Sequence, residues 1–289
     1  MRVVESARAR RGVALMGVCN VTPDSFSDGG RYLEADAARA RVDELLSEGA
    51  DLVDVGGEST RPRATPVPAR EQLRRVLGVV QYAVGRGACV TVDTASPEVA
   101  AACLDAGACA VNDVSCLLDP ELARVTAASG AAMILMHARG NQQDMGGYSQ
   151  YPDDAYGDVV ADVLAEWEQA AGRAKSQGLG RDALVMDPGL GFMKNARHSL
   201  DLLRRTGDLV SRLDVPVAVG ASRKSFLATA DRDAPPSGRI GASIAAAIHA
   251  ASAGAAIVRV HDVRATRQAI DLTRTLQARH AHGEREKGP

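Results

Sequence analysis

The chain has 289 residues, of which 46% are hydrophobic and 24% are charged, and its formal net charge is −2. These values are close to those of average globular proteins, so they exclude an intrinsically disordered chain, a collagen-like repeat and a small disulfide scaffold. The balanced charge also argues against a general nucleic-acid or membrane-surface binder, while it is compatible with a local anion pocket.

Apolar runs rich in Val, Ile and Ala alternate with longer amphipathic stretches along the chain. The runs are almost continuously apolar, which is typical of strands buried on both faces. They predict strands at 13–19, 52–55, 89–93, 108–112, 132–136, 184–187, 216–220 and 256–260. The amphipathic stretches predict helices at 36–48, 69–85, 97–106, 119–129, 154–178, 197–212, 239–253 and 264–280. Glycine follows several of these helices, as at Gly49 and Gly107, where it is the usual residue after a helix end.

Eight strand-then-helix units in succession predict an α/β fold, the (β/α)8 TIM barrel. The alternative is a doubly wound sheet, which usually has a GxGxxG turn after its first strand, and this chain has no such turn there. No linker divides the chain, so we expect one domain over 1–289 with its core at about 13–280. We expect the polar stretch 138–153 to be a mobile loop and the last ten residues to be a flexible tail.

The five cysteines are odd in number and have no CxxC spacing. Disulfide frameworks usually have an even number of cysteines and zinc sites usually have closely spaced pairs, so the pattern indicates free thiols in the reducing cytoplasm. The basic N-terminal segment leads into a short apolar run, VALMGV, which is shorter than a signal peptide requires. No stretch approaches the roughly 20 apolar residues of a membrane span. We therefore expect a cytoplasmic protein.

Polar residues stand at the ends of most predicted strands, which is where TIM barrels have their active sites. Asp93, Asn112 and Asp187 end three of the strands, and Lys224 follows the seventh. This mixture of donors and acceptors is suited to reading the edge of a flat polar heterocycle, because a buried polar site rejects ligands that leave its groups unpaired. The alternative for any one of these residues is a cap of a turn or helix. Eight strand ends that are nearly all polar favour a binding site.

A second group of polar residues belongs to predicted strands one, seven and eight, near which TIM barrels often bind phosphate. The group consists of Asn20, Ser222, Arg259 and His261. Arg suits an anion because its guanidinium is planar and donates two parallel hydrogen bonds. The alternative for Arg259 is a salt bridge with a neighbour. Buried charge is rare at the end of an apolar strand, and we take this rarity to favour the anion.

The loops after the first two predicted strands are long and contain glycine pairs, Gly29-Gly30 and Gly56-Gly57, with Pro23 and Pro62 close by. Glycine supplies backbone freedom, so these loops are candidates for lids that close over a substrate. The alternative is a pair of ordinary turns, because Gly and Pro mark turns in any protein.

Eight segments follow one another at these strand ends. They are NVTPDSFSDGG (20–30), DVGGESTRP (54–62), VDT with PEVA (92–94 and 97–100), ND (112–113), LMH (135–137), DPGLGF (187–192), GASRKSF (220–226) and IVRVHDV (257–263). Together they resemble the dihydropteroate synthase family. The resemblance covers roughly 13–275, and its first, second and seventh segments are highly specific.

The resemblance implies a (β/α)8 barrel and a transferase of folate biosynthesis. Members of this family condense 6-hydroxymethyl-7,8-dihydropterin pyrophosphate with 4-aminobenzoate, and they release 7,8-dihydropteroate and pyrophosphate. They use Mg2+, are commonly homodimers and are targets of sulfonamides. The resemblance thus implies two small-molecule substrates and a metal ion, and it implies no nucleic-acid or membrane partner.

The resemblance also implies three subsites and a catalytic set. The pterin subsite falls on Asp93, Asn112, Met136, Asp187, Phe192 and Lys224. The pyrophosphate subsite falls on Asn20, Ser222, Arg259 and His261, with Asn20 helping to bind Mg2+. The 4-aminobenzoate subsite falls on Thr60, Arg61, Pro62, Phe192, Lys224 and Ser225. The catalytic set is Asp93, Asp187, Lys224, Arg259 and Asp24, which would stabilise a pterin cation and the departing pyrophosphate.

The chain departs from the usual family pattern at Arg63, Ala95, Ser96, Met193 and Ala228. None of these residues belongs to the implied subsites, although Arg63 and Met193 flank the aminobenzoate side. Three alternatives stay open: a non-catalytic paralogue that binds pterin or another ligand, the pterin-binding barrel of a folate-dependent methyltransferase, and a phosphate-binding barrel enzyme of another pathway. The methyltransferase would not need the SRKS and RVH segments or the NVTPDSFSDGG loop, and the two loop motifs argue against the third alternative. The sequence therefore favours an active synthase.

Overall fold

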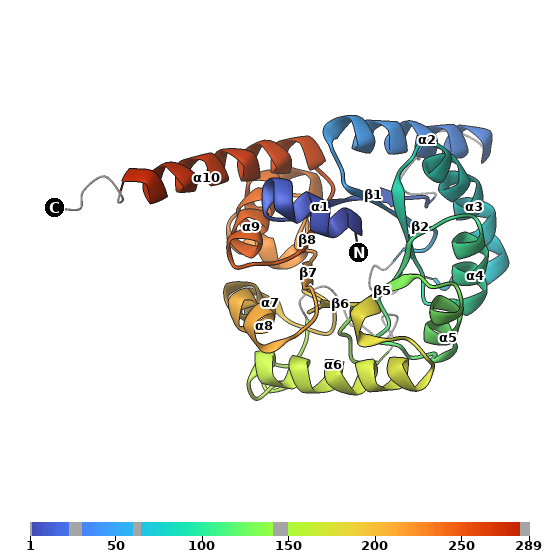
Figure 1. Ribbon diagram of the computed structural model, residues 1–289. Coiled ribbons are helices and arrows are strands. Elements are labelled where there is room, and N and C mark those ends of the chain that lie inside the picture. Colours follow the sequence, from blue (N-terminus) through green and yellow to red (C-terminus); the bar gives the residue numbers. More distant parts are fainter. Residues whose placement is uncertain (1, 23–30, 60–64, 141–149, 284–289) are drawn as a thin grey trace.

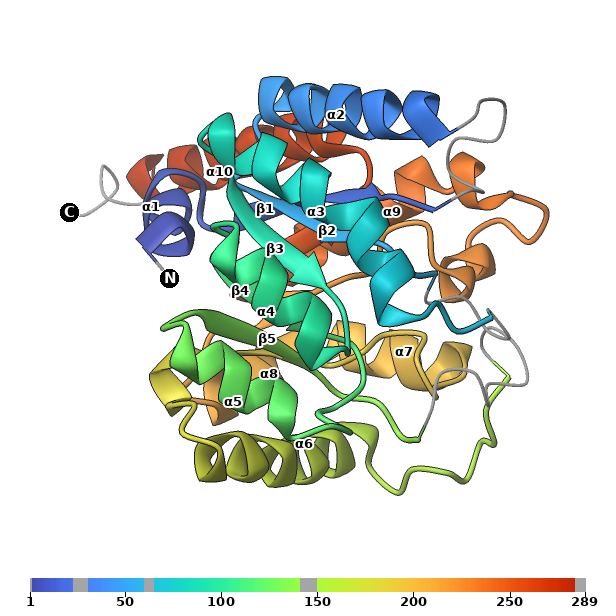
Figure 2. The ribbon, with the colours of Figure 1, turned by 90° about the vertical axis from the view of Figure 1, so that its right-hand side faces the viewer.

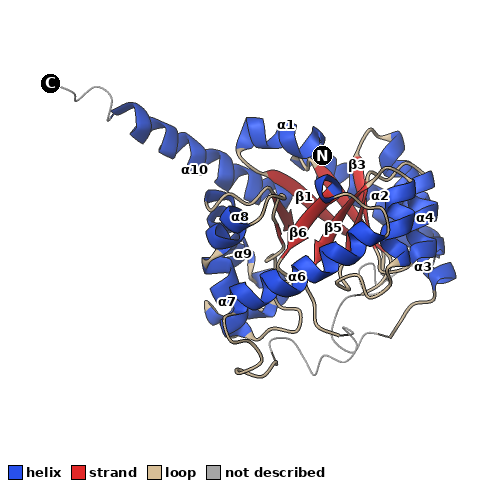
Figure 3. Ribbon diagram, turned by 60° about the horizontal axis from the view of Figure 1, so that its bottom comes forward, coloured by secondary structure: helices blue, strands red, loops and turns tan. Residues whose placement is uncertain are grey.

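The structure is a computed structural model and describes residues 2–22, 31–59, 65–140 and 150–283. Its parallel strands form the centre of the molecule and its helices surround them, as Figures 1 and 3 show. The strands are Ala14–Asn20 (β1), Leu52–Gly56 (β2), Cys89–Asp93 (β3), Ala110–Asp113 (β4), Ala132–Met136 (β5), Leu184–Asp187 (β6), Ala218–Val219 (β7) and Ile257–Val260 (β8).

The eight strands form one sheet in the order β6-β5-β4-β3-β2-β1-β8-β7, and every pair is parallel. A parallel bridge between Met186 of β6 and Val217, the residue before β7, joins the two ends of this sheet. The sheet is therefore a closed barrel, which confirms the predicted TIM barrel and excludes the doubly wound alternative.

Helix α1 precedes β1, and the other helices follow the strands in sequence. They are Arg2–Arg11 (α1), Arg31–Glu48 (α2), Ala69–Gly85 (α3), Pro97–Asp105 (α4), Glu121–Ala128 (α5), Val159–Ser176 (α6), Ala196–Arg204 (α7), Thr206–Arg212 (α8), Ile240–Ser252 (α9) and Val263–Gly283 (α10). Short 3-10 helices lie at Arg181–Ala183, Ser225–Thr229 and Pro236–Gly238. Within the described ranges, no helix is long and apolar enough to cross a membrane.

Four of the predicted helices differ from the sequence prediction. Helix α2 begins at Arg31, five residues before its predicted start. The stretch 197–212 is two helices, because the backbone of Arg205 leaves helical geometry between α7 and α8. Helix α6 begins at Val159, where the Asp158 side chain accepts hydrogen bonds from two backbone amides of the first turn. Helix α10 continues to Gly283 and projects from the body of the barrel, so the first part of the expected tail is helical (Figure 1).

Helix α1 has no counterpart in the prediction, and it covers the end of the barrel at which the strands begin. Its Val4 and Ala7 are buried, and they belong to an apolar cluster with Ala14, Leu52 and Ile257 at the strand starts. Figure 2 shows α1 at one end of the barrel and the loops that follow the strands at the other. The carboxyl ends of the strands therefore form the end that α1 leaves open.

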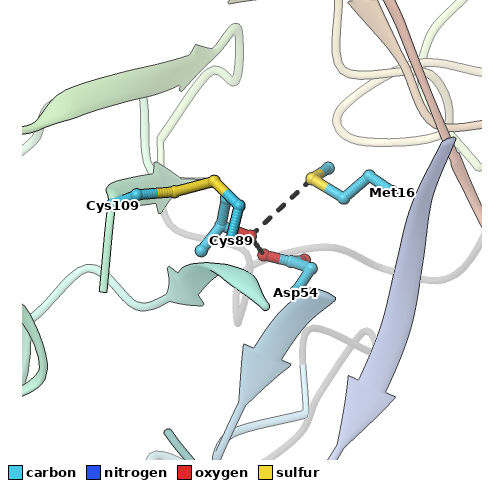
Figure 4. Close-up of a disulfide and its surroundings, with 5 residues drawn as sticks. Met16, Asp54, Cys89 and Cys109 are labelled. Carbon is cyan, nitrogen blue, oxygen red and sulfur yellow. Dashed lines mark hydrogen bonds between the residues drawn. A yellow bond between two sulfur atoms is a disulfide. The ribbon is translucent and has the colours of Figure 1, made fainter. Parts of the chain in front are cut away.

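The prediction of five free thiols is wrong for one pair. Cys89 begins β3, Cys109 directly precedes β4, and the two form a disulfide with their Cα atoms 6.0 Å apart (Figure 4). Neighbouring parallel strands bring these residues together, because Thr91 of β3 pairs with Ala110 of β4. Strand register, which residue spacing does not reveal, is what placed them side by side. The other cysteines, Cys19, Cys103 and Cys116, are free and buried.

Candidate active site

The carboxyl ends of β1 to β4 bring four of the singled-out positions together. In the sheet register, Asn20 pairs with Gly56, Gly56 with Asp93, and Asp93 with Asn112. Asp93 and Asn112 are buried, whereas Asn20 is exposed at the rim. A Cβ added to Gly56 would lie 3.3 Å from that of Asp93, so glycine here leaves room for the carboxylate. The open end of the barrel therefore has a polar lining.

A buried network of charges lies directly beneath this lining. Arg259 of β8 donates through Nε to Asp54 Oδ2 at 2.7 Å and through Nη2 to Asp93 Oδ2 at 3.0 Å. Asn112 Nδ2 also donates to Asp54 Oδ2 at 3.1 Å, and the hydroxyl of Thr91 donates to Asp54 Oδ1. The preference against a salt bridge at Arg259 was therefore wrong, because two carboxylates from β2 and β3 face this guanidinium inside the barrel.

The surroundings of Asp93 raise the pKa of its carboxyl group above the value of an exposed aspartate. Burial raises the pKa of Asp93 to about 7, and the negative charge of Asp54 adds to this effect. The guanidinium of Arg259 opposes both and favours the carboxylate. Asp93 therefore changes its charge near neutral pH, which is the range where an active-site acid or base is useful.

Asp187, at the end of β6, and Lys224, which follows β7, interact through their opposite charges. Asp187 ends β6, and its Oδ1 accepts a 2.7 Å hydrogen bond from the backbone of Gly189. Lys224 donates to the carbonyl of Leu190 at 2.5 Å, and its Nζ lies 4.4 Å from the centre of the Phe192 ring. Burial raises the pKa of Asp187 and lowers that of Lys224 to about 8, and each charge opposes the shift of the other. The opposite charges of the two groups therefore favour the charged form of each.

The loop from Asp187 to Phe192 packs tightly against the end of β5. Gly189 has a φ of +66°, and a Cβ there would lie 2.0 Å from the carbonyl oxygen of His137 and 3.3 Å from Cγ of Met136. Only glycine fits this approach without a backbone shift. Met136 is buried at the end of β5, so the structure brings Met136 and the Phe192 loop together.

Ser222 and His261 form the opposite side of the open end. The Oγ of Ser222 accepts from the backbone amide of His261 at 3.2 Å and lies 3.0 Å from its ring Nδ1. Arg41 of α2 donates to the carbonyl of His261 at 2.5 Å, and Arg223 forms hydrogen bonds of 3.1 and 2.6 Å to Asp262. Burial, and then Arg259, lower the pKa of His261 to about 3. An uncharged imidazole next to three guanidiniums is a place where an anion is favoured.

A further cluster, of Lys194, His137 and Glu166, lies behind the Phe192 loop. Lys194 and His137 are buried, and Glu166 is partly exposed. The Nζ of Lys194 lies 2.9 Å from Nδ1 of His137 and donates to the carbonyl of Phe192 at 3.1 Å. The Nε2 of His137 lies 2.9 Å from Glu166. Burial lowers the pKa of Lys194 to about 7 and that of His137 to about 4. This cluster ties β5 and α6 to the loop that bears Phe192.

Several predicted site residues lie outside the described part of the chain. They are Asp24, Thr60, Arg61 and Pro62, together with Arg63. Ser225 is described and begins the 3-10 helix directly after Lys224. The structure thus gathers the described members of the predicted pterin and pyrophosphate subsites at one end of the barrel, with Ser225 adjacent to them.

Two residues of the site were not predicted from the sequence. Asp54 is the one charged residue in the apolar run LVDV, and that signal was available. Lys194 is nearly fully buried although it follows a glycine-rich turn, where a lysine is expected to be solvated. Nothing in the spacing of the sequence indicates that His137 and Glu166 would surround it.

Comparisons with known proteins agree with this geometry. A family model described as pterin binding enzyme matches residues 16–261. The dihydropteroate synthase of Mycobacterium leprae is 44% identical over 266 residues, which cover 90% of this chain and 92% of that protein. A probable bifunctional folylpolyglutamate synthase/dihydropteroate synthase of Haloferax volcanii is 41% identical over 90% of this chain, and this chain spans 30% of its length.

Solved structures with the same fold contain ligands. The dihydropteroate synthase of Xanthomonas albilineans with 4-aminobenzoic acid has a TM-score of 0.84 and 40% identity over 92% of this chain and 93% of that one. The same enzyme in complex with 7,8-dihydropteroate has a TM-score of 0.81 and 37% identity, over 92% and 94% of the two chains. The Yersinia pestis synthase in a sulfonamide complex has a TM-score of 0.84 and 36% identity, also over 92% and 94%.

Proposed function

The chain belongs to the dihydropteroate synthase family, and we propose that its barrel condenses 6-hydroxymethyl-7,8-dihydropterin pyrophosphate with 4-aminobenzoate. The products are 7,8-dihydropteroate and pyrophosphate. The observation that carries this proposal is the polar ring of Asp93, Asn112, Asp187 and Lys224 at the open end of the barrel. Relatives with this fold bind 4-aminobenzoic acid and 7,8-dihydropteroate, which supports the same substrates here.

We assign the pterin to the side of the ring formed by β3, β4 and β6. Asp93, Asn112 and Asp187 supply hydrogen-bonding groups that are already desolvated, so a ring with the matching donors and acceptors loses little on binding. Met136 and Phe192 supply apolar surface for the faces of a flat ring. Asn112 is already held by Asp54, which fixes the direction in which its amide presents its oxygen.

We assign the pyrophosphate to Ser222, His261, Arg259 and Asn20. Arg259 uses Nε and Nη2 for its two carboxylates, and Nη1 is the donor that we assign to the leaving group. The imidazole of His261 is uncharged in the free protein, and an anion beside it would raise its pKa and favour the charged form.

A magnesium ion fits this side of the site on the chemistry of its donors. Among the described residues, no group of three or more His, Cys, Asp or Glu could hold a metal ion. Mg2+ commonly keeps several waters and takes one or two protein oxygens together with substrate phosphates. The exposed amide of Asn20 offers one such oxygen. When bound with the pyrophosphate, the ion would neutralise part of the charge that develops as this group departs.

We assign 4-aminobenzoate to the mouth of the site, next to Phe192, Lys224 and Ser225. The ammonium of Lys224 lies over the Phe192 ring, so a carboxylate and an aromatic ring would find complementary partners side by side. Thr60, Arg61 and Pro62 complete this subsite in the proposal, and Asp24 would add negative charge from the first loop.

The reaction follows from the charges that face the substrate. The bond between the methylene carbon and the bridging oxygen breaks, and the electron pair leaves with pyrophosphate. The carboxylates of Asp93 and Asp187 stabilise the pterin cation, while Arg259 and Lys224 stabilise the leaving group. The neutral amine of 4-aminobenzoate then forms the new carbon–nitrogen bond and loses a proton to water. This order of steps needs no activated side-chain nucleophile.

The family resemblance also supports a homodimer in the cytoplasm and inhibition by sulfonamides. A sulfonamide complex of the Yersinia pestis relative supports the last of these. Size-exclusion chromatography with light scattering tests the dimer, and a single species at twice the chain mass of 30.2 kDa is expected.

Pyrophosphate release from the purified protein tests the proposed function. The protein is given the dihydropterin pyrophosphate and Mg2+, with and without 4-aminobenzoate, and dihydropteroate is measured by mass. Release that depends on 4-aminobenzoate and yields dihydropteroate is expected. If the protein binds the pterin in a calorimeter but releases no pyrophosphate, it is a non-catalytic paralogue and the proposal is wrong.

A further inference from the structure

We propose that Asp54, a carboxylate inside the barrel, is a positioning residue that fixes Arg259 and Asn112 for the reaction and sets the charge balance beside Asp93. The inference rests on the proposed function and adds to it a residue that none of the assigned subsites contains. Asp54 cannot be a catalytic residue in the free enzyme, because its side chain is fully buried.

The position of Asp54 explains why it acts through other residues. In the register of β2 and β3, Asp54 pairs with Thr91, and Gly56 pairs with Asp93. Asp54 therefore lies one layer below Asp93, toward the centre of the barrel. Figure 4 draws Asp54 together with Met16 and the Cys89–Cys109 disulfide. The hydroxyl of Thr91 donates a hydrogen bond to Oδ1 of Asp54. A substrate at the open end meets Asp93 and Asn112 before it could reach this layer.

Asp54 accepts hydrogen bonds from three different strands. Its partners are Nε of Arg259 on β8, Nδ2 of Asn112 on β4 and the hydroxyl of Thr91 on β3. Arg259 belongs to the proposed pyrophosphate subsite and Asn112 to the pterin subsite. One buried carboxylate thus connects the groups that hold the two halves of the same substrate, and a small displacement of Asp54 moves both groups.

The charges around Asp93 show why the carboxylate of Asp54 has an effect beyond packing. The groups that act on Asp93 are Asp54 and Glu58 from β2 and its loop, Arg259 from β8, Asp113 from β4 and Lys224 from the segment after β7. Arg259 is hydrogen-bonded to both Asp54 and Asp93, so one cation is shared by two carboxylates. The negative charge of Asp54 raises the pKa of Asp93, and removing this charge makes Asp93 easier to ionise.

The test compares Asp54→Asn with Thr91→Val in the full chain. Asparagine has nearly the same shape as aspartate but has no charge, whereas Thr91→Val removes one hydrogen bond to Asp54 and keeps the charge. The measurements are kcat, KM for the dihydropterin pyrophosphate, and the pH dependence of kcat/KM, whose acid limb reports the pKa of an essential group in the free enzyme.

The wild type is expected to show an acid limb near pH 7, since the pKa of Asp93 is about 7. In Asp54→Asn, kcat should fall on the order of a hundredfold, because misplaced binding groups cost about this much. The acid limb should move to lower pH by about half a unit or more. Thr91→Val should keep the wild-type acid limb and most of kcat. A purely structural role would lower the melting temperature of the Asn variant without moving this limb.

Two results with an active wild type would overturn the inference and leave the proposed function intact. In the first, Asp54→Asn keeps the wild-type kcat and the wild-type acid limb. In the second, Thr91→Val shifts the acid limb as far as Asp54→Asn does. An inactive wild type would instead refute the proposed function. If Asp54→Asn does not fold, Asp54→Glu decides the question. It keeps the charge but displaces the carboxylate by one methylene, so the inference predicts a lower kcat with an unmoved limb, and a wild-type kcat would contradict it.

Discussion

The two ends of the barrel are built from opposite kinds of side chain. At the amino end, Val4 and Ala7 of α1 close the barrel against apolar residues such as Leu52. At the carboxyl end, Asp93 and Arg259 are held beneath the surface in contact with one another. Burial of apolar surface stabilises the fold, whereas burial of charge opposes it unless the charges are paired. The difference indicates that the apolar amino end stabilises the fold, whereas the charged carboxyl end carries out the chemistry.

Removing a charge at the carboxyl end should have the largest effect. Arg259→Ala should lower kcat/KM on the order of a thousandfold, because it removes a donor aimed at the developing charge of the leaving group. It also leaves Asp54 and Asp93 without their shared cation. Steady-state pyrophosphate release measures this effect.

A matched control separates this effect from a general loss of positive charge. Arg264→Ala removes a largely exposed arginine of α10, which pairs with Glu48 on the surface. This variant should keep its activity within about twofold, since exposed ion pairs contribute little. If both variants lose activity to the same extent, Arg259 has no particular place in the reaction.

A charge introduced at the amino end should lower the free energy of unfolding and leave kcat unchanged. Ala7→Asp places a carboxylate where the native side chain has no solvent exposure, so the free energy of unfolding should fall by about 3 kcal/mol. Ala9→Asp is the matched control, because Ala9 is exposed on the same helix. Urea denaturation measures the difference. A variant at Ala7 that stays folded but loses its kcat at 25 °C would contradict the separation of the two ends.

Burial of ionisable groups at the carboxyl end should also make stability depend on pH. Burial, and then Lys194, lower the pKa of His137 to about 4. The unfolded chain takes up a proton at this residue below about pH 6.5, and the folded chain does so only near pH 4. The free energy of unfolding should therefore fall as the pH decreases through this window.

His137→Gln removes this contribution. Its free energy of unfolding should depend on pH less steeply than that of the wild type, by about 1.4 kcal/mol per pH unit within the window. Urea denaturation at several values between pH 7 and pH 4 gives both slopes. Equal slopes would mean that the buried imidazole is protonated in the folded state, next to Lys194.

The parts of the fold that a sequence can predict are those that local patterns determine. The strands at 89–93, 132–136 and 184–187 have the predicted bounds, because a short apolar run between turn residues has few other interpretations. Helix α1 was missed because half of its residues, RVVESARARR, are charged and only Val4 and Ala7 are buried. Its helical state depends on the barrel end that it covers, which no local window contains.

The candidate site also has a part that local sequence patterns predict and a part that depends on contacts between distant residues. Asp93, Asn112 and Asp187 were predicted because each stands where an apolar run ends, and the barrel brings all such ends to one side. The ion pairs of Arg259 and the role of Asp54 depend on which residues of β2, β3 and β8 share a layer. The Cys89–Cys109 pair depends on register as well. Such relations between distant residues become visible only once the strands are placed side by side.

The most direct test of the account is a calorimetric titration of 6-hydroxymethyl-7,8-dihydropterin pyrophosphate into the wild type and into Asn112→Ala. We assign the pterin to the open end of the barrel, against a buried amide that Asp54 orients. Measurable binding to the wild type is expected. The affinity of the variant should be at least about tenfold weaker, because a polar group of the ligand would lose its partner in a desolvated site. Equal affinities in the two proteins would show that the pterin binds elsewhere.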